Sequence, residues 1–390
     1  MTPAINCSNT KEVILKKYFL QKKEDMEMTK YLYNEEAVAN LRLSDTSVLD
    51  RLVDFESARA AHSKKEHAKK DKRMTIGEAV DTYVKDGDII TDGGFSYVRT
   101  PHQAFHEVIR QGKKNLQMIG SPNTNQSFFI FYGLVNYSHN SYSGAEMRGI
   151  DRLYDRALKN DRVTVLSEWS HGGMAQGFKA AQLGSPGVAS KQMIGSDLVR
   201  YNPYLKVIQN PLKKDKDPVV FVPALYPDVS FIHCHAADKY GNAYIYGPAV
   251  NDLAMAAAAR KVIITAEEIV PESDIRYNKQ GQIIPFFYAD AVVEMPFGAL
   301  PGSMPGCYYW PRQWWEKCMR WATLTDENAK TFLDEWIINI KDQFEFVEKL
   351  GGAKWIAEAR RQTKAAEGDN EDIDFSYEEF TLKHDSGLYY

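Results

Sequence analysis

Between residues 88 and 300 the chain alternates short β-branched runs with helical segments, and this alternation constrains the fold more than any other feature. Runs such as DIIT (88–91), VVFVPA (219–224) and KVIITAEE (261–268) have the length and composition of buried strands. Helical patterns lie between several of them, at residues 101–112, 148–160, 172–184 and 252–260. Such alternation predicts an α/β fold, an open and mostly parallel sheet with helices on both faces, whose ligands bind beyond the carboxyl ends of the strands.

Three domains are predicted from changes in composition along the chain. Residues 1–73 are rich in Lys and Glu and indicate a helical extension followed by a charged linker. Residues 74–322 contain the strand–helix alternation and form the α/β domain. Residues 323–390 begin with apolar positions spaced by three or four, which predict one long helix over 325–350 that ends at Gly351-Gly352, before an acidic tail.

Two local signals place boundaries inside this scheme. Thr75 and Glu78 have the spacing of a capping box, so a helix is predicted to begin there. Asp238, Gly241 and Asn242 are turn-forming residues between two strand-like runs, and they predict a β-hairpin.

Charge and cysteine spacing exclude several classes of protein. The formal net charge of −4 over 390 residues does not indicate a nucleic-acid or membrane-surface binder. The four cysteines have no CxxC spacing, so neither a disulfide framework nor a metal knuckle is predicted, and free thiols in a reducing compartment fit best. No apolar run approaches the roughly 18–20 residues of a membrane span, and we expect a cytoplasmic protein.

A glycine-rich turn follows the first predicted strand. In DIITDGGFSYVRTP (88–101) the strand leads to Gly93 and Gly94, which permit positive φ and let another molecule approach the backbone closely. The alternative is a tight strand-to-helix turn that binds nothing. The spacing is not GxGxxG and no acidic residue is placed to bind a ribose, so a nicotinamide-binding unit is disfavoured.

A helix start and a positive charge come directly after this turn. Thr100, Pro101 and Gln103 have the spacing of N-cap, first-turn proline and capping residue, and predict a helix that presents free N–H groups. Arg99 adds a full charge beside them. Together these features predict a site for a phosphate or a carboxylate, although an ordinary surface arginine is the alternative.

Several motifs in the same order resemble the α subunits of family I coenzyme A transferases, glutaconate CoA-transferase in particular. The first is DGDIITDGGFSYVRTP, with Gly-Gly-Phe followed by Arg-x-Pro. It is followed by SEWSHGGMAQGFKAAQLGSPGVAS, MIGSDL, VPALYPDVSFIHCHAADKYGNAYIYGP, TAEEIV and DAVVEMPFGALPG. The resemblance covers roughly residues 75–355 and implies the CoA-transferase (NagB-like) fold, to which the helical N-terminal extension is an addition.

The resemblance also implies a mechanism and a partner. In this family a glutamate attacks an acyl-CoA thioester, an acyl–glutamyl anhydride forms, CoA becomes attached to the glutamate, and an incoming acid then takes the CoA. In two-subunit members that glutamate lies on the β subunit, in a segment that is not found here. We therefore expect coenzyme A as substrate, no metal, an obligate β subunit, and an α2β2 or larger assembly.

The substrate-binding residues that this resemblance suggests lie after the first strand. They are Gly93, Gly94, Phe95 and Arg99. From its position after the strand NLQMIG, Asn123 is a further candidate that would donate a hydrogen bond to a substrate. An alternative role for Asn123 is to cap a helix.

Glu168, Ser170 and His171 form a second candidate cluster, where the strand RVTVL (162–166) gives way to a helix. A carboxylate, a hydroxyl and an imidazole at a strand's carboxyl end can position or protonate a substrate. The alternative is that Ser170 caps the helix and Glu168 bonds internally. If the partner's glutamate is absent, the same scaffold would serve a CoA-thioester hydrolase, a ring-opening C–C lyase or a decarboxylase, with Glu168 as general base.

Two further features have less specific interpretations. His233 and His235 share one strand face without a third ligand, so buried, hydrogen-bonded histidines are predicted rather than a metal site. The aromatic stretch 307–321 either lines an acyl pocket or packs against the partner chain.

The third functional hypothesis, beside the transferase and the hydrolase, lyase or decarboxylase, is a non-catalytic ligand sensor. No DNA-binding helix pair or basic face in the sequence supports it.

Overall fold

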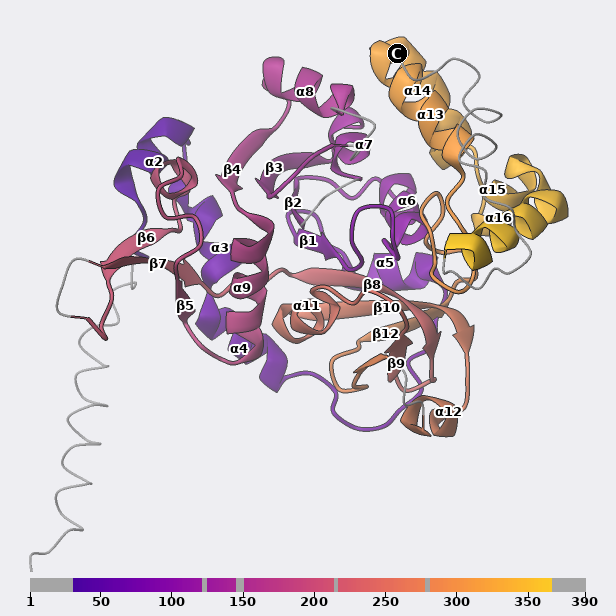
Figure 1. Cartoon of the computed structure of the whole chain (residues 1–390), viewed down its shortest axis with the longest axis horizontal. Coiled ribbons are helices and arrows are strands. Elements are labelled where there is room, and N and C mark those ends of the chain that lie inside the picture. Colours follow the sequence, from indigo (N-terminus) through magenta and orange to yellow (C-terminus); the bar gives the residue numbers. More distant parts are fainter. Residues whose placement is uncertain (1–30, 121–124, 145–150, 214–216, 278–280, 367–390) are drawn as a thin grey trace, which may run out of the picture. The chain divides into compact units, whose positions relative to one another are not determined.

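The β-branched runs form a nine-stranded sheet at the centre of the described part of the chain (Figure 1). The computed structural model describes residues 31–120, 125–144, 151–213, 217–277 and 281–366. Residues up to Tyr33 belong to a separate N-terminal unit, of which the Tyr31–Tyr33 ring contact at 6.3 Å is described. The second unit begins at Asn34 and contains the sheet and its helices.

Parallel strands make up most of the sheet, as predicted. Their order is β4-β3-β2-β1-β8-β10-β12. Their bounds are β1 Ile89–Asp92, β2 Leu116–Gly120, β3 Val135–Asn140, β4 Thr164–Glu168, β8 Val229–Ala237, β10 Lys261–Ile269 and β12 Ala291–Glu294. Because these strands are parallel, their carboxyl ends meet at one edge of the sheet, and this edge carries the polar residues discussed below.

The predicted hairpin extends one side of the sheet. β9 (Ala243–Ile245) pairs antiparallel with β8, and β11 (Gln282–Ile284) with β9. Asp238 makes the turn, because its Oδ1 accepts hydrogen bonds from the backbone N–H groups of Tyr240, Gly241 and Asn242 at 2.9–3.0 Å.

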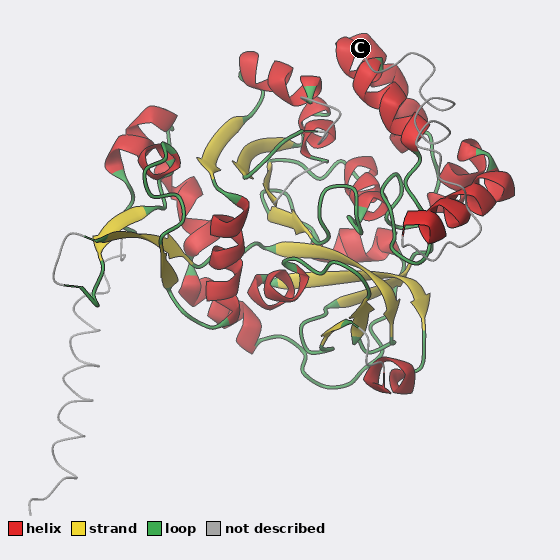
Figure 2. Ribbon diagram, in the orientation of Figure 1, coloured by secondary structure: helices red, strands yellow, loops and turns green. Residues whose placement is uncertain are grey.

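Helices cover both faces of the sheet (Figure 2), which the burial of successive strand residues confirms. On β8, Phe231 packs in one core cluster with Phe105 of α6, whereas its neighbour Ile232 packs in another with Ala256 of α11. The helices of the α/β region are α5 Ile76–Tyr83, α6 His102–Arg110, α7 Gln126–Phe131, α8 Arg152–Lys159, α9 His171–Gln182, α11 Asp252–Ala258 and α12 Glu272–Tyr277. The strands are therefore buried on both sides, which explains their continuous apolar runs.

The capping box before α5 is confirmed. The Glu78 backbone N–H donates to Thr75 Oγ1 at 3.2 Å, and the Thr75 N–H donates to Glu78 Oε2 at 2.8 Å. Two of the N–H groups that lack a helical partner at this helix start are thereby satisfied.

Part of the strand pattern belongs to a second, antiparallel sheet that the sequence did not separate from the first. It has the order β5-β7-β6, with β5 Gly187–Ser190, β7 Pro218–Pro223 and β6 Lys206–Gln209, and α10 (Leu198–Tyr201) precedes β6. β6 is an exposed edge strand of this sheet, with Val207 55% exposed.

The described part of the N-terminal extension is helical, as predicted. Its elements are α2 Glu35–Leu41, the 3-10 helix η1 Thr46–Leu49, α3 Asp50–Val53 and α4 Phe55–Ser63. Leu52 is fully buried and its carbonyl accepts from Tyr226 N–H at 2.8 Å. Arg51 forms an ion pair with Asp228 at 2.7 Å, and the buried Lys65 forms one with Asp290 at 3.1 Å. The division into 1–73, 74–322 and 323–390 stays a prediction.

The single long helix predicted over 325–350 is wrong. The elements are α13 Arg312–Arg320, η3 Ala322–Leu324, α14 Asp326–Leu333, the π-helical turn η4 Asp334–Ile338, α15 Gln343–Leu350 and α16 Gly352–Ala366. Asp342 starts α15 by accepting from the N–H groups of Phe344 and Glu345, each at 3.0 Å. The break changes the phase of the apolar face, so Phe346 is buried and Phe344 is 52% exposed. Gly351 does end α15, as predicted, with φ at 124°.

Among the described residues, no helix has both the length and the apolar character that a bilayer span requires. The same residues contain no group of three or more His, Cys, Asp or Glu side chains arranged to hold a metal ion.

Candidate functional site

The glycine turn after β1 is packed tightly against the chain itself. Gly94 has φ at +80°, as predicted for the turn, and an added Cβ would lie 2.5 Å from Val98 O. An added Cβ on Gly93 would lie 2.6 Å from Asp252 Oδ1. The N–H of Gly93 donates to Phe231 O at 2.8 Å and that of Gly94 to Asp252 Oδ1 at 2.9 Å. Both glycines are thus required, but their N–H groups are already satisfied within the chain.

Arg99 is buried and its charge is paired within the chain, so it is not the ordinary surface arginine of the alternative interpretation. Its side chain is 0% exposed and forms a bidentate ion pair with Asp252, Nη1–Oδ1 at 3.0 Å and Nη2–Oδ2 at 2.9 Å. Its Nε donates to Pro248 O at 3.1 Å. Because burial of an unpaired guanidinium is costly, the chain supplies a carboxylate from the first residue of α11. Arg99 therefore holds the turn in place, and its role as a substrate-binding residue stays a prediction.

The predicted helix start at Thr100 is also wrong in its details. α6 begins at His102 without a side-chain cap. Thr100 Oγ1 donates to Ser96 O and Gln103 Nε2 donates to Leu300 O, each at 2.8 Å. The Gln103 N–H donates to Gly298 O at 3.1 Å. This helix start is buried under the 298–308 segment, so it presents no open anion site.

A cluster of exposed and partly exposed side chains lies at the carboxyl edge of the sheet, over the ends of β1, β3 and β4. We call Phe95, Ser141, Tyr142, Glu168 and His171 the strand-end cluster. His171, the first residue of α9, is exposed, and its Nδ1 lies 3.0 Å from Ser141 Oγ. Its ring lies 5.5 Å from that of Phe95 and 6.3 Å from that of Tyr142. These contacts join residues that lie far apart in the sequence.

Glu168 is the last residue of β4 and is exposed, opposite Asn140 in the β3–β4 register. Its backbone carbonyl accepts from Asn202 Nδ2 at 2.7 Å, so the strand end is fixed while the carboxylate faces solvent. Ser170 caps α9, because its Oγ accepts from Gly173 N–H at 3.0 Å, which is the structural alternative foreseen for it. Asn123 lies outside the described residues.

The cluster contains groups that can bind and orient a small polar ligand. His171 and Ser141 offer hydrogen-bond donors and acceptors, Phe95 and Tyr142 offer ring faces, and Glu168 offers a carboxylate. Sequence reasoning missed Ser141 and Tyr142, which directly follow β3, and the apolar run in this part of the sequence was the available signal.

The two histidines of β8 are hydrogen-bonded and largely buried, as predicted. His233 Nδ1 lies 2.9 Å from Thr265 Oγ1, and its Nε2 lies 2.7 Å from Glu267 Oε1. His235 Nε2 lies 2.7 Å from Pro305 O, and burial lowers the pKa of His235 to about 4. With their nitrogens occupied, neither ring is free to bind a metal.

The aromatic stretch 307–321 packs largely into the chain's own core, which neither predicted role anticipated. Trp314 and Trp315 are buried, with their ring centroids 4.9 Å apart. Trp314 lies 5.0 Å from Phe332 of α14 and 6.0 Å from Phe346 of α15. The stretch therefore fixes the C-terminal helices on the α/β region.

Comparison with known proteins identifies the family. Residues 73–295 match the family model of coenzyme A transferase. One of the subunits of the glutaconate CoA-transferase of Acidaminococcus fermentans is 31% identical over 302 residues, which cover 73% of this chain and 93% of that protein. An uncharacterized protein of Archaeoglobus fulgidus is 37% identical over 293 residues, or 75% of this chain, and the match spans 65% of that protein's length.

Solved structures give the same result. The crystal structure of glutaconate CoA-transferase from Acidaminococcus fermentans has a TM-score of 0.69 at 30% identity, covering 74% of this chain and 95% of that one. A variant of the decarboxylase AibA/AibB has a TM-score of 0.61 at 28% identity, covering 69% and 98%. The predicted fold is confirmed, and the chain belongs to the coenzyme A transferase family.

Proposed function

We propose that this chain is the α subunit of a heteromeric CoA-transferase that moves CoA between an acyl-CoA and a carboxylic or dicarboxylic acid. The observation that carries the proposal is the match along 93% of a protein named as one subunit of such an enzyme. That name implies a second subunit, which we propose to be an obligate β chain in an α2β2 or larger assembly. We also propose a cytoplasmic location, which the thiols Cys234 and Cys318, neither of them in a disulfide, support.

The proposed reaction uses a glutamate on the partner chain. Its carboxylate attacks the thioester carbonyl and releases CoA thiolate, which leaves an acyl–glutamyl anhydride. The thiolate then attacks the glutamyl carbonyl of the anhydride, which frees the first acid and leaves a glutamyl-CoA thioester. The acceptor acid repeats these steps in reverse order, so it leaves as a thioester and the glutamate is regenerated.

This chain would bind and orient the acid. Phe95 and Tyr142 would enclose its carbon skeleton, and His171 with Ser141 would donate to its carboxylate. Gly93 and Gly94 would set the position of Phe95 rather than bind the ligand, because their N–H groups are used internally. Asn123 stays a proposed donor, and Ser170 acts by capping α9.

The test is mass spectrometry of the complex of this chain with its partner. After incubation with an acyl-CoA and no acceptor acid, we expect a covalent CoA adduct on the partner chain. Adding an acceptor acid should remove the adduct and yield a new acyl-CoA. If the CoA adduct forms on this chain, or if acid is released at the same rate without an acceptor, the proposal is overturned.

The likeness to a decarboxylase favours a second candidate, a CoA-thioester hydrolase, C–C lyase or decarboxylase on the same scaffold. Glu168, exposed in the strand-end cluster, would be its general base. Glu168→Gln should then lower turnover by about 100-fold or more, since a general base contributes 10²–10⁴. If the chain is part of a transferase, the CoA adduct on the partner still forms in Glu168→Gln. Glu56→Gln, at an exposed glutamate of α4, is the matched control.

A further inference from the structure

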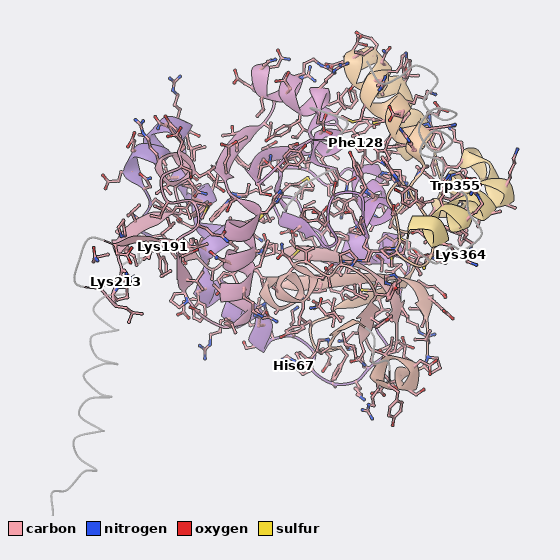
Figure 3. The ribbon with its side chains drawn as sticks, viewed as in Figure 1. His67, Phe128, Lys191, Lys213, Trp355 and Lys364 are labelled. Carbon is pink, nitrogen blue, oxygen red and sulfur yellow. The ribbon has the colours of Figure 1, made fainter. Side chains whose placement is uncertain are left out.

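A cavity opens at the same edge of the sheet as the strand-end cluster, next to the last described helix. We call it the α16 cavity. It has a volume of about 500 Å³ and lies among the ends of β8 and β10, the 296–308 segment and α16. Figure 3 labels Lys364, on the C-terminal part of α16. Its lining includes His235, Glu267, Phe297, Tyr308, Arg360 and Lys364.

On the side of the cavity formed by the sheet, Glu267 and His235 have little capacity left for a ligand, whereas Glu268 of β10 is exposed. Glu267 Oε1 accepts from Tyr308 Oη at 2.5 Å and lies 2.7 Å from His233 Nε2, and its Oε2 accepts from Phe297 N–H at 2.8 Å. The ring nitrogens of His235 are used by Pro305 O at 2.7 Å and by the Tyr246 N–H at 3.0 Å. These groups form a rigid wall whose polar atoms are satisfied within the chain.

The side formed by α16 is different, because it carries two exposed cations. Arg360 and Lys364 are four residues apart, on one face of the helix, and both line the cavity. Neither forms an ion pair with any described residue, whereas the adjacent Arg361 is held by Glu358 at 2.7 and 2.9 Å. A guanidinium and an ammonium together offer eight donors and no acceptor, so they select an anionic ligand.

We propose that the α16 cavity binds the phosphate groups of a nucleotide-sized ligand. Its volume is in the range of small-molecule sites, about 300–1,000 Å³. The partly exposed ring of Phe297 offers a base a face to stack on. Arg360 and Lys364 lie beyond residues 73–295, so they are an addition to the scaffold that the family model covers.

Two sources could supply this chemistry, the nucleotide end of coenzyme A and a free nucleotide. The coenzyme A source rests on the proposed function. β8 lies directly beside β1 in the sheet, and neighbouring strands are about 4.8 Å apart, so the cavity and the strand-end cluster share one edge. A ligand as long as an acyl-CoA could occupy both. A free nucleotide would instead occupy the cavity alone.

Calorimetric titration of the full chain in complex with its partner tests the site directly. The probes are coenzyme A, ATP and pantetheine, which lacks the phosphates. We expect binding of coenzyme A or ATP that weakens as salt increases. The double variant Arg360→Gln/Lys364→Gln should bind about 10- to 100-fold more weakly, as expected for the loss of two charge-assisted contacts. Arg361→Gln, on the same helix but paired with Glu358, should bind like the wild type.

Unchanged affinity for both coenzyme A and ATP in the double variant would overturn the inference. Glu268→Gln tests the charge preference of the site in the opposite direction. Glu268 lines the cavity, so removing its negative charge should tighten phosphate binding. Weaker phosphate binding in this variant would contradict the assignment. Tight ATP binding with weak coenzyme A binding would identify a free nucleotide as the source. If the complex binds nucleotide but does not exchange CoA between thioesters and acids, the α16 cavity is supported and the proposed function is refuted. If the complex does exchange CoA and the Arg360/Lys364 double variant binds like the wild type, the proposed function is supported and the α16 site is refuted.

Discussion

At the scale of single residues, the buried pair of Arg99 and Asp252 holds the loop that follows β1. The Asp252 carboxylate accepts two hydrogen bonds from the Arg99 guanidinium and one from the Gly94 N–H, so three N–H donors depend on this one side chain. Both charged side chains are completely shielded from solvent. Removing either partner would leave the other charge buried and unpaired.

We therefore predict that Asp252→Ala lowers the free energy of unfolding by about 3–5 kcal/mol, the usual cost of breaking a buried pair. Urea denaturation followed by far-UV circular dichroism measures this. The control is Asp155→Ala, which breaks the exposed Lys159–Asp155 pair at 2.7 Å and should change stability by less than about 1 kcal/mol. Equal effects of the two substitutions would show that the buried pair does not stabilise the loop.

The same residues show where prediction from the sequence fails. Gly94 and its positive φ could be predicted, because the conformation is a local property of glycine. The partner of Arg99 could not, because Asp252 is 153 residues away and looks like an ordinary helix-start residue. Ser141 and His171 likewise meet only through the pairing of β3 with β4.

At the scale of elements, the N-terminal helices are anchored to the α/β region by apolar and ionic contacts. Leu49 and Leu52 are fully buried, and Arg260 Nη2 donates to the carbonyls of Arg51 and Asp54 at 3.2 and 3.3 Å. The anchoring rests on side chains of the extension itself, so single substitutions there should affect the stability of the chain.

Leu52→Ala should lower the free energy of unfolding by about 2–5 kcal/mol, because it removes a fully buried side chain and leaves a cavity. The control is Leu212→Ala at a leucine that is 92% exposed, where we expect less than about 0.5 kcal/mol. Chemical denaturation of both variants measures the two changes in the free energy of unfolding. If Leu52→Ala behaves like Leu212→Ala, the extension does not contribute to the stability of the folded chain.

Element types were largely predictable, and their limits and order were not. The apolar runs of β1, β8 and β10 follow from burial on both faces, which composition reveals. The pairing of β8 with both β1 and β10 joins strands that lie far apart in the sequence, and no local sequence pattern predicts it. The break after α14 depends on a π-helical turn and on Asp342 as a cap, and a regular apolar spacing conceals both.

At the scale of the whole molecule, buried titratable groups should make stability depend on pH. Burial raises the pKa of Asp92 to about 8, with a further contribution from Asp252. The folded chain then keeps a proton that the unfolded chain loses above about pH 4, so this stability is present at low pH and is lost as pH rises towards 8. Burial lowers the pKa of His102 to about 4 and of His139 to about 3, so their contribution is lost as pH falls below about 6.5.

We predict that Asp92→Asn becomes more stable relative to the wild type as pH rises, by at least about 1 kcal/mol between pH 5 and pH 8, because the amide cannot lose a proton. Urea midpoints of both proteins at several pH values measure the difference. Taking the difference removes the contribution of the histidines, which both proteins share. A difference that is constant with pH would mean that Asp92 is already ionised in the folded chain.

The hydrogen bond from Gly94 to Asp252 has one more consequence. Gly94 lies outside every strand, where amides usually exchange with deuterium quickly, yet its hydrogen is held by a carboxylate that water does not reach. Exchange there requires α11 to separate from the end of β1. The rate of deuterium uptake at the Gly94 amide would therefore measure how often α11 and the end of β1 separate.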